Sequence, residues 1–311
     1  MNFIKLKKGR QDIRMKKFFK FLGILILLLI IAAVFFVVTF KPPTYSDYDV
    51  FTGLRSFVPE VLQDAGATER DISKEFETFA LDLSFPFNKM FGCSSVGIPL
   101  RAFSSDTIAT ATISQFEAPP SSGYFRDFVL NIRPDYNLQA PAFHMDFMKP
   151  SPGTPGLCSI DFFNVDKDVI VLETFFGSDF EVIKKAFESV SKFQRTAEEG
   201  RGKITKYLDP YKTAYRMELI EPKDEAERKE YYLTVDKAFK AILPLYLKKI
   251  NACEPVANYA EGHEEKMKKF VTEIYVNDFA VALGRKMFKE SFKRYWLDGF
   301  WFVDMELPEG E

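Results

Sequence analysis

Asp146 is the residue whose surroundings point most directly to chemistry. Residues 142–148 read A-F-H-M-D-F-M, and the alternation places F, M and F on one side of a strand and His144 with Asp146 on the other. A carboxylate in so apolar a strand is costly unless it is paired, protonated or hydrated. Burial that raises its pKa would leave a proton available for donation. A structural carboxylate bound to a backbone amide or an arginine is the alternative.

His144 lies close enough to Asp146 to act with it. Residues two apart on one strand are separated by roughly 6.5–7 Å and point the same way, so both side chains can meet one flat ligand. An imidazolium at His144 would lower the pKa of the carboxyl, and the two groups would titrate as a pair. The alternative is a half-exposed strand histidine. The other histidine, His263, is interpreted as a residue on a helix surface.

Asp278 is the second acid in an unusual setting. It follows a helical stretch at 263–275 and precedes another at 279–295. A helix N-cap and a ligand contact are both consistent with this position.

Composition and motifs exclude several kinds of protein. The sequence has no G-x-S-x-G, P-loop, C-x-x-C or H-E-x-x-H motif, and three cysteines with two histidines do not predict a metal site. Residues 1–41 hold nine of the 42 Lys and Arg residues and one of the 44 Asp and Glu residues, so the rest of the chain is acidic. Nucleic-acid binding is therefore not expected. The 34 phenylalanines suit either a Phe-rich core or a flat aromatic pocket.

The order of the predicted elements defines the fold class. Strands are expected at 98–116 (two strands around a Ser-Ser-Asp turn), 125–132, 142–165 (a hairpin) and 213–219; helices are expected at 56–79, 180–194, 224–244, 263–275 and 279–295. Segment 169–174 is either an edge strand or a loop. Pro244 should kink or end the long helix that begins at Asp224. Strands followed by helices predict an α+β fold, an antiparallel sheet covered by helices.

The N-terminal segment predicts a membrane anchor. Residues 1–20 are basic, and 21–40 are twenty residues without a charge, long enough at about 1.5 Å per residue to cross a bilayer core of about 30 Å. A cleaved signal peptide is the alternative, but no small-x-small site precedes Pro42. The basic residues predict a cytoplasmic or stromal N-terminus, with the domain on the opposite side of a membrane such as that of a plastid. A linker at 41–55 would lead to one domain at 56–311.

Two motifs resemble those of a known family. The run P-D-Y-N-L-Q-A-P-A-F-H-M-D-F-M from Pro134 is similar to the central motif of the ferredoxin-dependent bilin reductases, in which two prolines precede F-G-x-D. The run Y-V-N-D-F-A-V-A-L-G-R-K-M-F from Tyr275 is similar to the family's N-D motif and the helix after it. Red chlorophyll catabolite reductase, a related branch, is a less good match because of Asp146.

The resemblance implies a three-layer α/β/α sandwich with a central antiparallel sheet. It also implies a membrane-anchored oxidoreductase that reduces a linear tetrapyrrole, with reduced ferredoxin as external electron donor and no bound cofactor. The alternatives are a non-catalytic bilin carrier and an enzyme like the chlorophyll-catabolite reductase.

By the same resemblance, Asp146 would protonate the bilin, with Asp278 and His144 as further catalytic residues. The chain departs from the family at His144, where the family has glycine, at Val129, where the phycocyanobilin-forming branch has a catalytic histidine, and at Phe279, where Lys or Arg is frequent. The residues expected to contact the substrate lie next to the two motifs; they are Asn131, Phe143, Met148, Asn277 and Phe279.

Overall fold

The computed structural model describes residues 50–82, 94–118, 125–149, 155–195 and 206–308. The basic segment at 1–20, the expected span at 21–40 and most of the linker lie outside these ranges. Within them, no helix is long and apolar enough to cross a membrane.

A seven-stranded sheet organises the described part of the chain. Every neighbouring pair is antiparallel, in the order β1-β4-β5-β6-β7-β8-β9. The strands are β1 (Thr68–Glu69), β4 (Leu100–Ser104), β5 (Ile108–Ala118), β6 (Phe125–Pro134), β7 (Ala142–Lys149), β8 (Leu157–Phe163) and β9 (Lys212–Ile220). A separate two-stranded sheet pairs β2 (Ala80–Asp82) with β3 (Ser95–Gly97).

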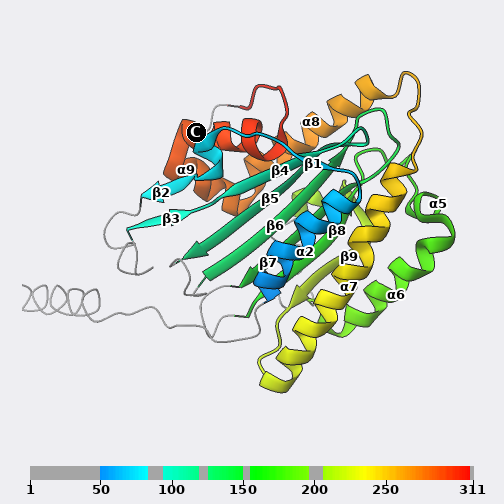
Figure 1. The fold of residues 1–311 in the computed structure, drawn as a ribbon, viewed down its shortest axis with the longest axis horizontal. Helices are drawn as coiled ribbons and strands as arrows, with labels where there is room; N and C mark the ends of the chain where they lie inside the picture. Colours follow the sequence, from blue (N-terminus) through cyan, green and yellow to red (C-terminus); the bar gives the residue numbers. More distant parts are fainter. Residues whose placement is uncertain (1–49, 83–93, 119–124, 150–154, 196–205, 309–311) are drawn as a thin grey trace, which may run out of the picture. The chain divides into compact units, whose positions relative to one another are not determined.

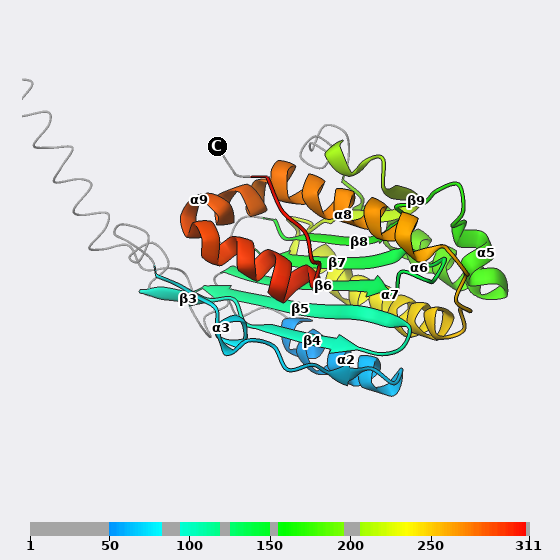
Figure 2. The same ribbon diagram turned by 90° about the horizontal axis from the view of Figure 1, so that it is seen from above.

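Helices cover both faces of the large sheet (Figures 1 and 2). One layer contains α2 (Val50–Asp64), α5 (Leu172–Phe176), α6 (Phe180–Val190) and α7 (Glu225–Asn251). The other contains α8 (Ala260–Asn277), α9 (Phe279–Arg294) and a π-helical segment, η4 (Tyr295–Trp301). The short helix α3 (Lys74–Glu77) precedes β2. The α+β class, the antiparallel sheet and the 142–165 hairpin are confirmed.

The face toward α2, α6 and α7 is apolar and holds the larger core. Alternate residues of each strand are completely buried there, among them Phe128, Leu130, Phe143, Phe147 and Ile160. Phe143 stacks on Tyr246 of α7 with ring centroids 5.2 Å apart. This face follows directly from the period-2 alternation in the sequence.

The opposite face meets a second, aromatic cluster from α8, α9 and η4. Its members include Phe270, Tyr275, Trp296, Phe300 and Trp301. A hydrogen bond between the hydroxyls of Tyr295 and Ser114, 2.9 Å long and buried, ties η4 to β5.

Two local predictions are wrong, because tertiary packing outweighs local propensity. Helix α7 does not end at Pro244 but continues to Asn251, since the residues on both sides of the proline are buried in the core. The stretch 56–79 is not one helix, because α2 ends at Asp64 and the chain then forms β1 and α3. Leu233 is an apolar residue of α7, but it is 46 % exposed and lies outside the buried face of the helix. For segment 169–174, residues 169–171 form a loop, one of the two alternatives, and residues 172–174 belong to α5.

A buried ion pair fixes the turn end of the β7–β8 hairpin. The Nζ of Lys149 donates to Glu221 Oε1 at 2.5 Å and also to the hydroxyl of Tyr232. The other carboxylate oxygen of Glu221 accepts from the backbone N–H of Gly156 at 2.6 Å. A Cβ at Gly156 would lie 2.9 Å from that oxygen, so only glycine allows this approach. Both charged side chains are under 5 % exposed.

Replacing Lys149 with methionine should therefore destabilise the protein strongly. The substitution leaves the buried Glu221 carboxylate with the partly exposed Arg228, 3.5 Å away, as its remaining cation. Removing one partner of a buried ion pair typically costs about 3–5 kcal/mol. Lys192→Met is the matched control, because Lys192 and Glu230 form an ion pair that is more than half exposed. That control should cost less than about 1 kcal/mol in urea unfolding. Equal losses in the two variants would show that the buried pair has no special weight.

Candidate functional site

Strand register assembles rows of polar side chains across the face that α8, α9 and η4 cover. Each row contains one residue from each of five neighbouring strands, β5 to β9. One row is Ser114, Val129, Asp146, Ser159 and Glu218; the next is Thr112, Asn131, His144, Asp161 and Arg216. A functional face thus arises from residues that are far apart in the sequence.

Part of this face is only half-buried, unlike the apolar face. Asp127, His144, Asp146 and Met148 all retain partial exposure, as does Asp278 above them. A ligand lying against the sheet would meet these side chains first.

Asp146 faces another acid, Asp127. Val129 is the cross-strand partner of Asp146 in β6, so Asp127 is the diagonal neighbour of Asp146 on the same face, and each carboxyl group acts on the pKa of the other. Burial raises the pKa of Asp146 well above its usual range, and the charges of Asp127 and then Asp278 raise it further. Burial also raises the pKa of Asp127, to about 6. Burial and the neighbouring charges therefore both favour the protonated form of Asp146.

His144 is held as a neutral imidazole. Burial, and after it the charge of Lys212, lowers its pKa to about 4. Its Nδ1 lies 2.7 Å from Asn131 Oδ1, and because an amide oxygen only accepts, Nδ1 carries the proton. His144 and Asp146 share a face as the alternation predicts. The interaction observed at Asp146 is with an acid rather than with an imidazolium.

Asp161 is a further buried acid on this face, beside His144. It is 4 % exposed, and burial raises its pKa to about 7, against the opposing charge of Lys212. Lys212 itself pairs with Glu218 at 2.5 Å in a buried salt bridge. The Oδ1 of Asp161 has no hydrogen-bond partner among the described residues.

Asp278 is both a helix cap and a polar contact above the sheet. Its Oδ1 accepts from the backbone N–H of Val281 at 3.0 Å, in the first turn of α9. Its Oδ2 accepts from the hydroxyl of Tyr207 at 2.7 Å. Burial, and then the charge of Asp278, raises the pKa of that phenol. The charge of Asp278 also raises the pKa of Asp146, so the two aspartates of the sequence motifs interact electrostatically.

The residues predicted to contact the substrate do not all lie on the polar face of the sheet. Asn131 and Met148 lie on the polar face, but Phe143 points into the opposite core. The side chain of Asn277 is exposed and donates to Glu273 O. The side chain of Phe279 is outside the described residues.

The sequence predicted that His263 lies on a helix surface, and this prediction is wrong. It is 2 % exposed, and its ring contacts those of Tyr136 and Tyr259. Among the described residues, no three His, Cys, Asp or Glu side chains converge to hold a metal ion.

Sequence reasoning missed Asp127, Asp161 and Tyr207. The first had a recognisable signal, because residues 125–133 read F-R-D-F-V-L-N-I-R and alternate like the strand of Asp146. Asp161 sits in the equally apolar run L-C-S-I-D-F-F. Tyr207, in a short 3₁₀ turn at Lys206–Leu208, gave no local signal.

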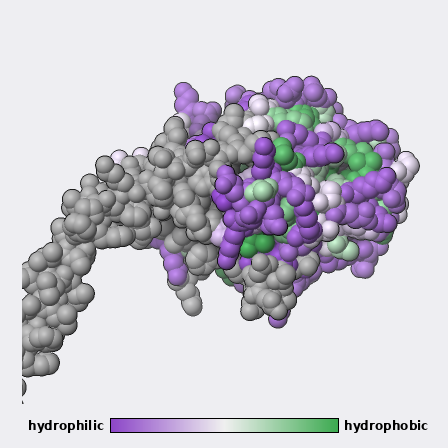
Figure 3. Space-filling view, turned by 90° about the horizontal axis from the view of Figure 1, so that it is seen from below, coloured by the Kyte–Doolittle hydropathy of each residue, from purple (hydrophilic) through white to green (hydrophobic). Residues whose placement is uncertain are grey.

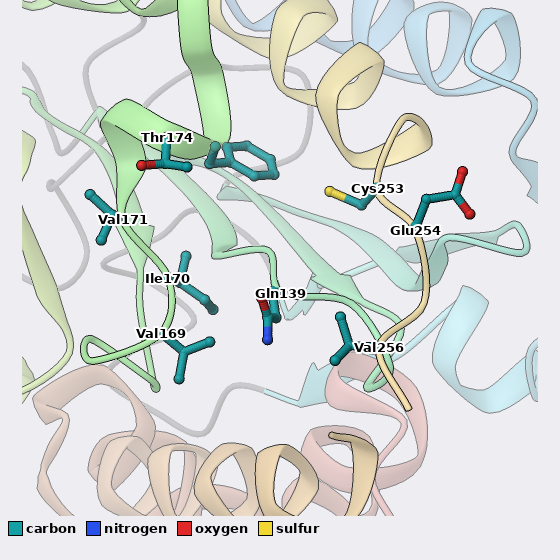
Figure 4. Close-up of a pocket in the computed structure, with 9 residues that line it drawn as sticks. Gln139, Val169, Ile170, Val171, Thr174, Cys253, Glu254 and Val256 are labelled. Atoms are coloured by element: carbon teal, nitrogen blue, oxygen red, sulfur yellow. The ribbon is translucent and has the colours of Figure 1, made fainter. Parts of the chain in front are cut away.

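A surface groove of about 310 Å³ lies elsewhere, between the loop before α5 and the chain after α7 (Figure 4). Val169, Val171 and Thr174 line one side and Cys253 with Glu254 the other, while Gln139 lies between them (Figure 4). The view in Figure 3 shows a mostly hydrophilic described surface with separate apolar areas. The groove has no set of converging polar groups, so the polar face of the sheet is the better candidate site.

Comparison with known proteins bears on the fold. The chain is similar in structure to phytochromobilin synthase from tomato, whose selenomethionine form was crystallised in complex with biliverdin. The TM-score is 0.58 at 10 % sequence identity, over 82 % of this chain and 86 % of the synthase. No protein-family model and no curated protein sequence matches the chain. The two proteins thus share a fold.

Asp161→Asn tests the burial of acids on this face. A carboxyl whose pKa rises on folding stabilises the protein below its unfolded pKa of 3.8, and that contribution is lost as the pH rises to about 7. Between pH 4.5 and pH 8, urea unfolding should show the variant gaining about 3 kcal/mol relative to the wild type. Asp106→Asn, in an exposed turn, is the control. A difference that is the same at both pH values would contradict the raised pKa.

Proposed function

We propose that this protein binds a linear tetrapyrrole against the polar face of its sheet and reduces it, with Asp146 as the proton donor. The observation that carries the proposal is a half-buried carboxyl group on the partly exposed polar face, beside a second acid, with a pKa that burial raises. The fold shared with a synthase crystallised with biliverdin supports the choice of ligand.

The chemistry requires such a carboxyl group. A conjugated double bond that accepts an electron becomes more basic, and it needs a proton before the second electron can be accommodated. An acid with a pKa near the working pH supplies that proton most effectively. Burial, and then the charges of the neighbouring acids, shift the pKa of Asp146 upward, in the direction of this requirement.

The surroundings suit a flat, extended ligand with polar edges. Val129 and Met148 offer apolar contact next to Asp146. Asn131 and Ser159 offer amide and hydroxyl groups for the lactam oxygens and pyrrole N–H groups of a bilin. Arg216, half-buried in the row of His144, offers positive charge for its carboxylates.

The proposal includes an external electron donor and a membrane anchor. A reduced ferredoxin, the donor that the motif resemblance implies, would deliver single electrons. Residues 21–40 would anchor the domain, on the strength of their twenty uncharged residues.

Asp146→Asn should abolish reduction and retain binding, because an amide fills the same volume but is not an acid. Purified protein would be mixed with biliverdin, and reduced ferredoxin would then be added without oxygen. We expect an absorbance shift on mixing in wild type and variant. The later bleaching should slow at least about 100-fold in the variant, with Asp106→Asn as the matched control.

The same experiment separates the alternatives. A wild-type shift on mixing with no later change would indicate a carrier rather than a reductase. No shift at either step would exclude a bilin ligand. Reduction by Asp146→Asn at the wild-type rate would place the proton donor elsewhere.

Asp278→Asn tests whether the second aspartate contacts the ligand as well as capping α9. Asparagine caps helices about as well as aspartate, so thermal unfolding should change little. Removing the charge that faces Asp146 should alter the affinity for biliverdin or the pattern of products separated by chromatography. A variant with wild-type binding and products would leave Asp278 with a structural role only.

A further inference from the structure

Asp127 is an acid to which neither sequence motif assigns a role, and it occupies a place where chemistry is constrained. It pairs with Met148 across β6 and β7, while Val129 pairs with Asp146. The two carboxyl groups are therefore diagonal neighbours on one face, close enough for each to act on the pKa of the other. Strand register sets this arrangement, so no loop needs to move to bring them together.

A hydrogen bond between two carboxyl groups requires a proton. An ionised carboxylate has only acceptor oxygens, so at least one member of a bonded pair must be protonated. The Oδ1 atoms of Asp127 and Asp146 are inaccessible to solvent and have no partner among the described residues. The remaining oxygens can thus satisfy each other only while the pair holds a proton.

The groups around the pair favour retention of that proton. Asp278 acts on Asp146 from the junction of α8 and α9, and Tyr207 from the 3₁₀ turn bonds to Asp278. Tyr295 of η4 lies beside Asp127 and bonds to Ser114 of β5. The other titratable neighbours on the same face are Asp161 of β8 and Glu218 of β9. Two more, Cys158 and Tyr231, act from the opposite side of the sheet. Two cations lie on this face: Lys212 is paired with Glu218, and Arg216 lies opposite Asp161 and lowers its pKa.

We propose that Asp127 and Asp146 form a dyad that holds one proton between them, and that this dyad is the proton source for the reduction. The second half of this inference rests on the function proposed above. Two adjacent carboxyl groups cannot both ionise readily, so the first gives up its proton and the second holds on to its own. The raised pKa of Asp127, about 6, and the raised pKa of Asp146 both favour a proton held by the pair.

The dyad would act twice in each reduction. One reduced iron–sulfur carrier gives an electron to the conjugated ligand, and the dyad gives a proton that forms the first C–H bond. The dyad is then a dianion, whose repulsion draws a proton from water. A second carrier gives the second electron and the reloaded dyad gives the second proton. One C=C bond, two electrons and two protons become one CH–CH unit, and two carriers are oxidised.

Asp127→Asn is the decisive variant. An amide in place of Asp127 removes the like charge and can donate a hydrogen bond to ionised Asp146, so Asp146 should lose its proton at lower pH. In ligand-free full-length protein, the carbonyl stretch of the protonated carboxyl can be followed by infrared difference spectroscopy from pH 5 to pH 10. An Asp161→Asn background removes the third acid on this face. The midpoint of the infrared titration of Asp146 should fall by at least about one pH unit, a tenfold change in proton affinity.

Controls and turnover complete the test. Asp106→Asn should leave the midpoint unchanged, and circular dichroism should show that every variant is folded. The alkaline limb of biliverdin reduction should move down by the same amount as the midpoint. An unchanged midpoint in Asp127→Asn, or no protonated carboxyl above pH 7 in the wild type, would overturn the dyad. A shifted midpoint in a protein that does not reduce biliverdin would uphold the shared proton and refute the proposed function.

Discussion

The burial of ionisable side chains on one face of the sheet is the constraint on which the rest of the structure depends. Helices cover both faces, but only the face toward α7 is apolar (Figure 2). The other face must satisfy its polar groups within the sheet, because buried polar groups are costly when unpaired. Asn131 bonds to His144 across β6 and β7, and Lys212 pairs with Glu218 within β9. The proposed dyad of Asp127 and Asp146 would hold its two acids together through a proton.

Much of the fold could be predicted because its signals are local. Alternation placed strands β5 to β8, and Asp224 marks the start of α7 by accepting from two backbone N–H groups of the first turn. The failures occurred where distant packing decides. Pro244 is tolerated inside α7 because the core holds the helix on both sides of it, and His263 is buried because aromatic rings from other segments surround it.

The candidate site was predictable one strand at a time and not across strands. A period of two fixes that His144 and Asp146 share a face, so the sequence suffices for that pair. It does not fix which residues of β6 lie opposite, because register depends on turn length and on the packing of both faces. The imidazolium expected beside Asp146 is therefore replaced by Asp127, and His144 pairs with Asn131 instead. Asp278 could be placed at a helix boundary, but its bond to Tyr207 joins segments 71 residues apart.

The acids of this face work against the stability of the protein at neutral pH. Asp127, Asp146 and Asp161 all have a raised pKa, so each favours the folded state less as the pH rises from acid to neutral. Asparagine or serine would fill the same space without that loss. Sites that break the rules of stable folding in this way are typical of functional sites rather than of structural ones. A fold shared at 10 % identity does not specify chemistry, whereas three destabilising carboxyl groups gathered on one face indicate a site where protons are held for use.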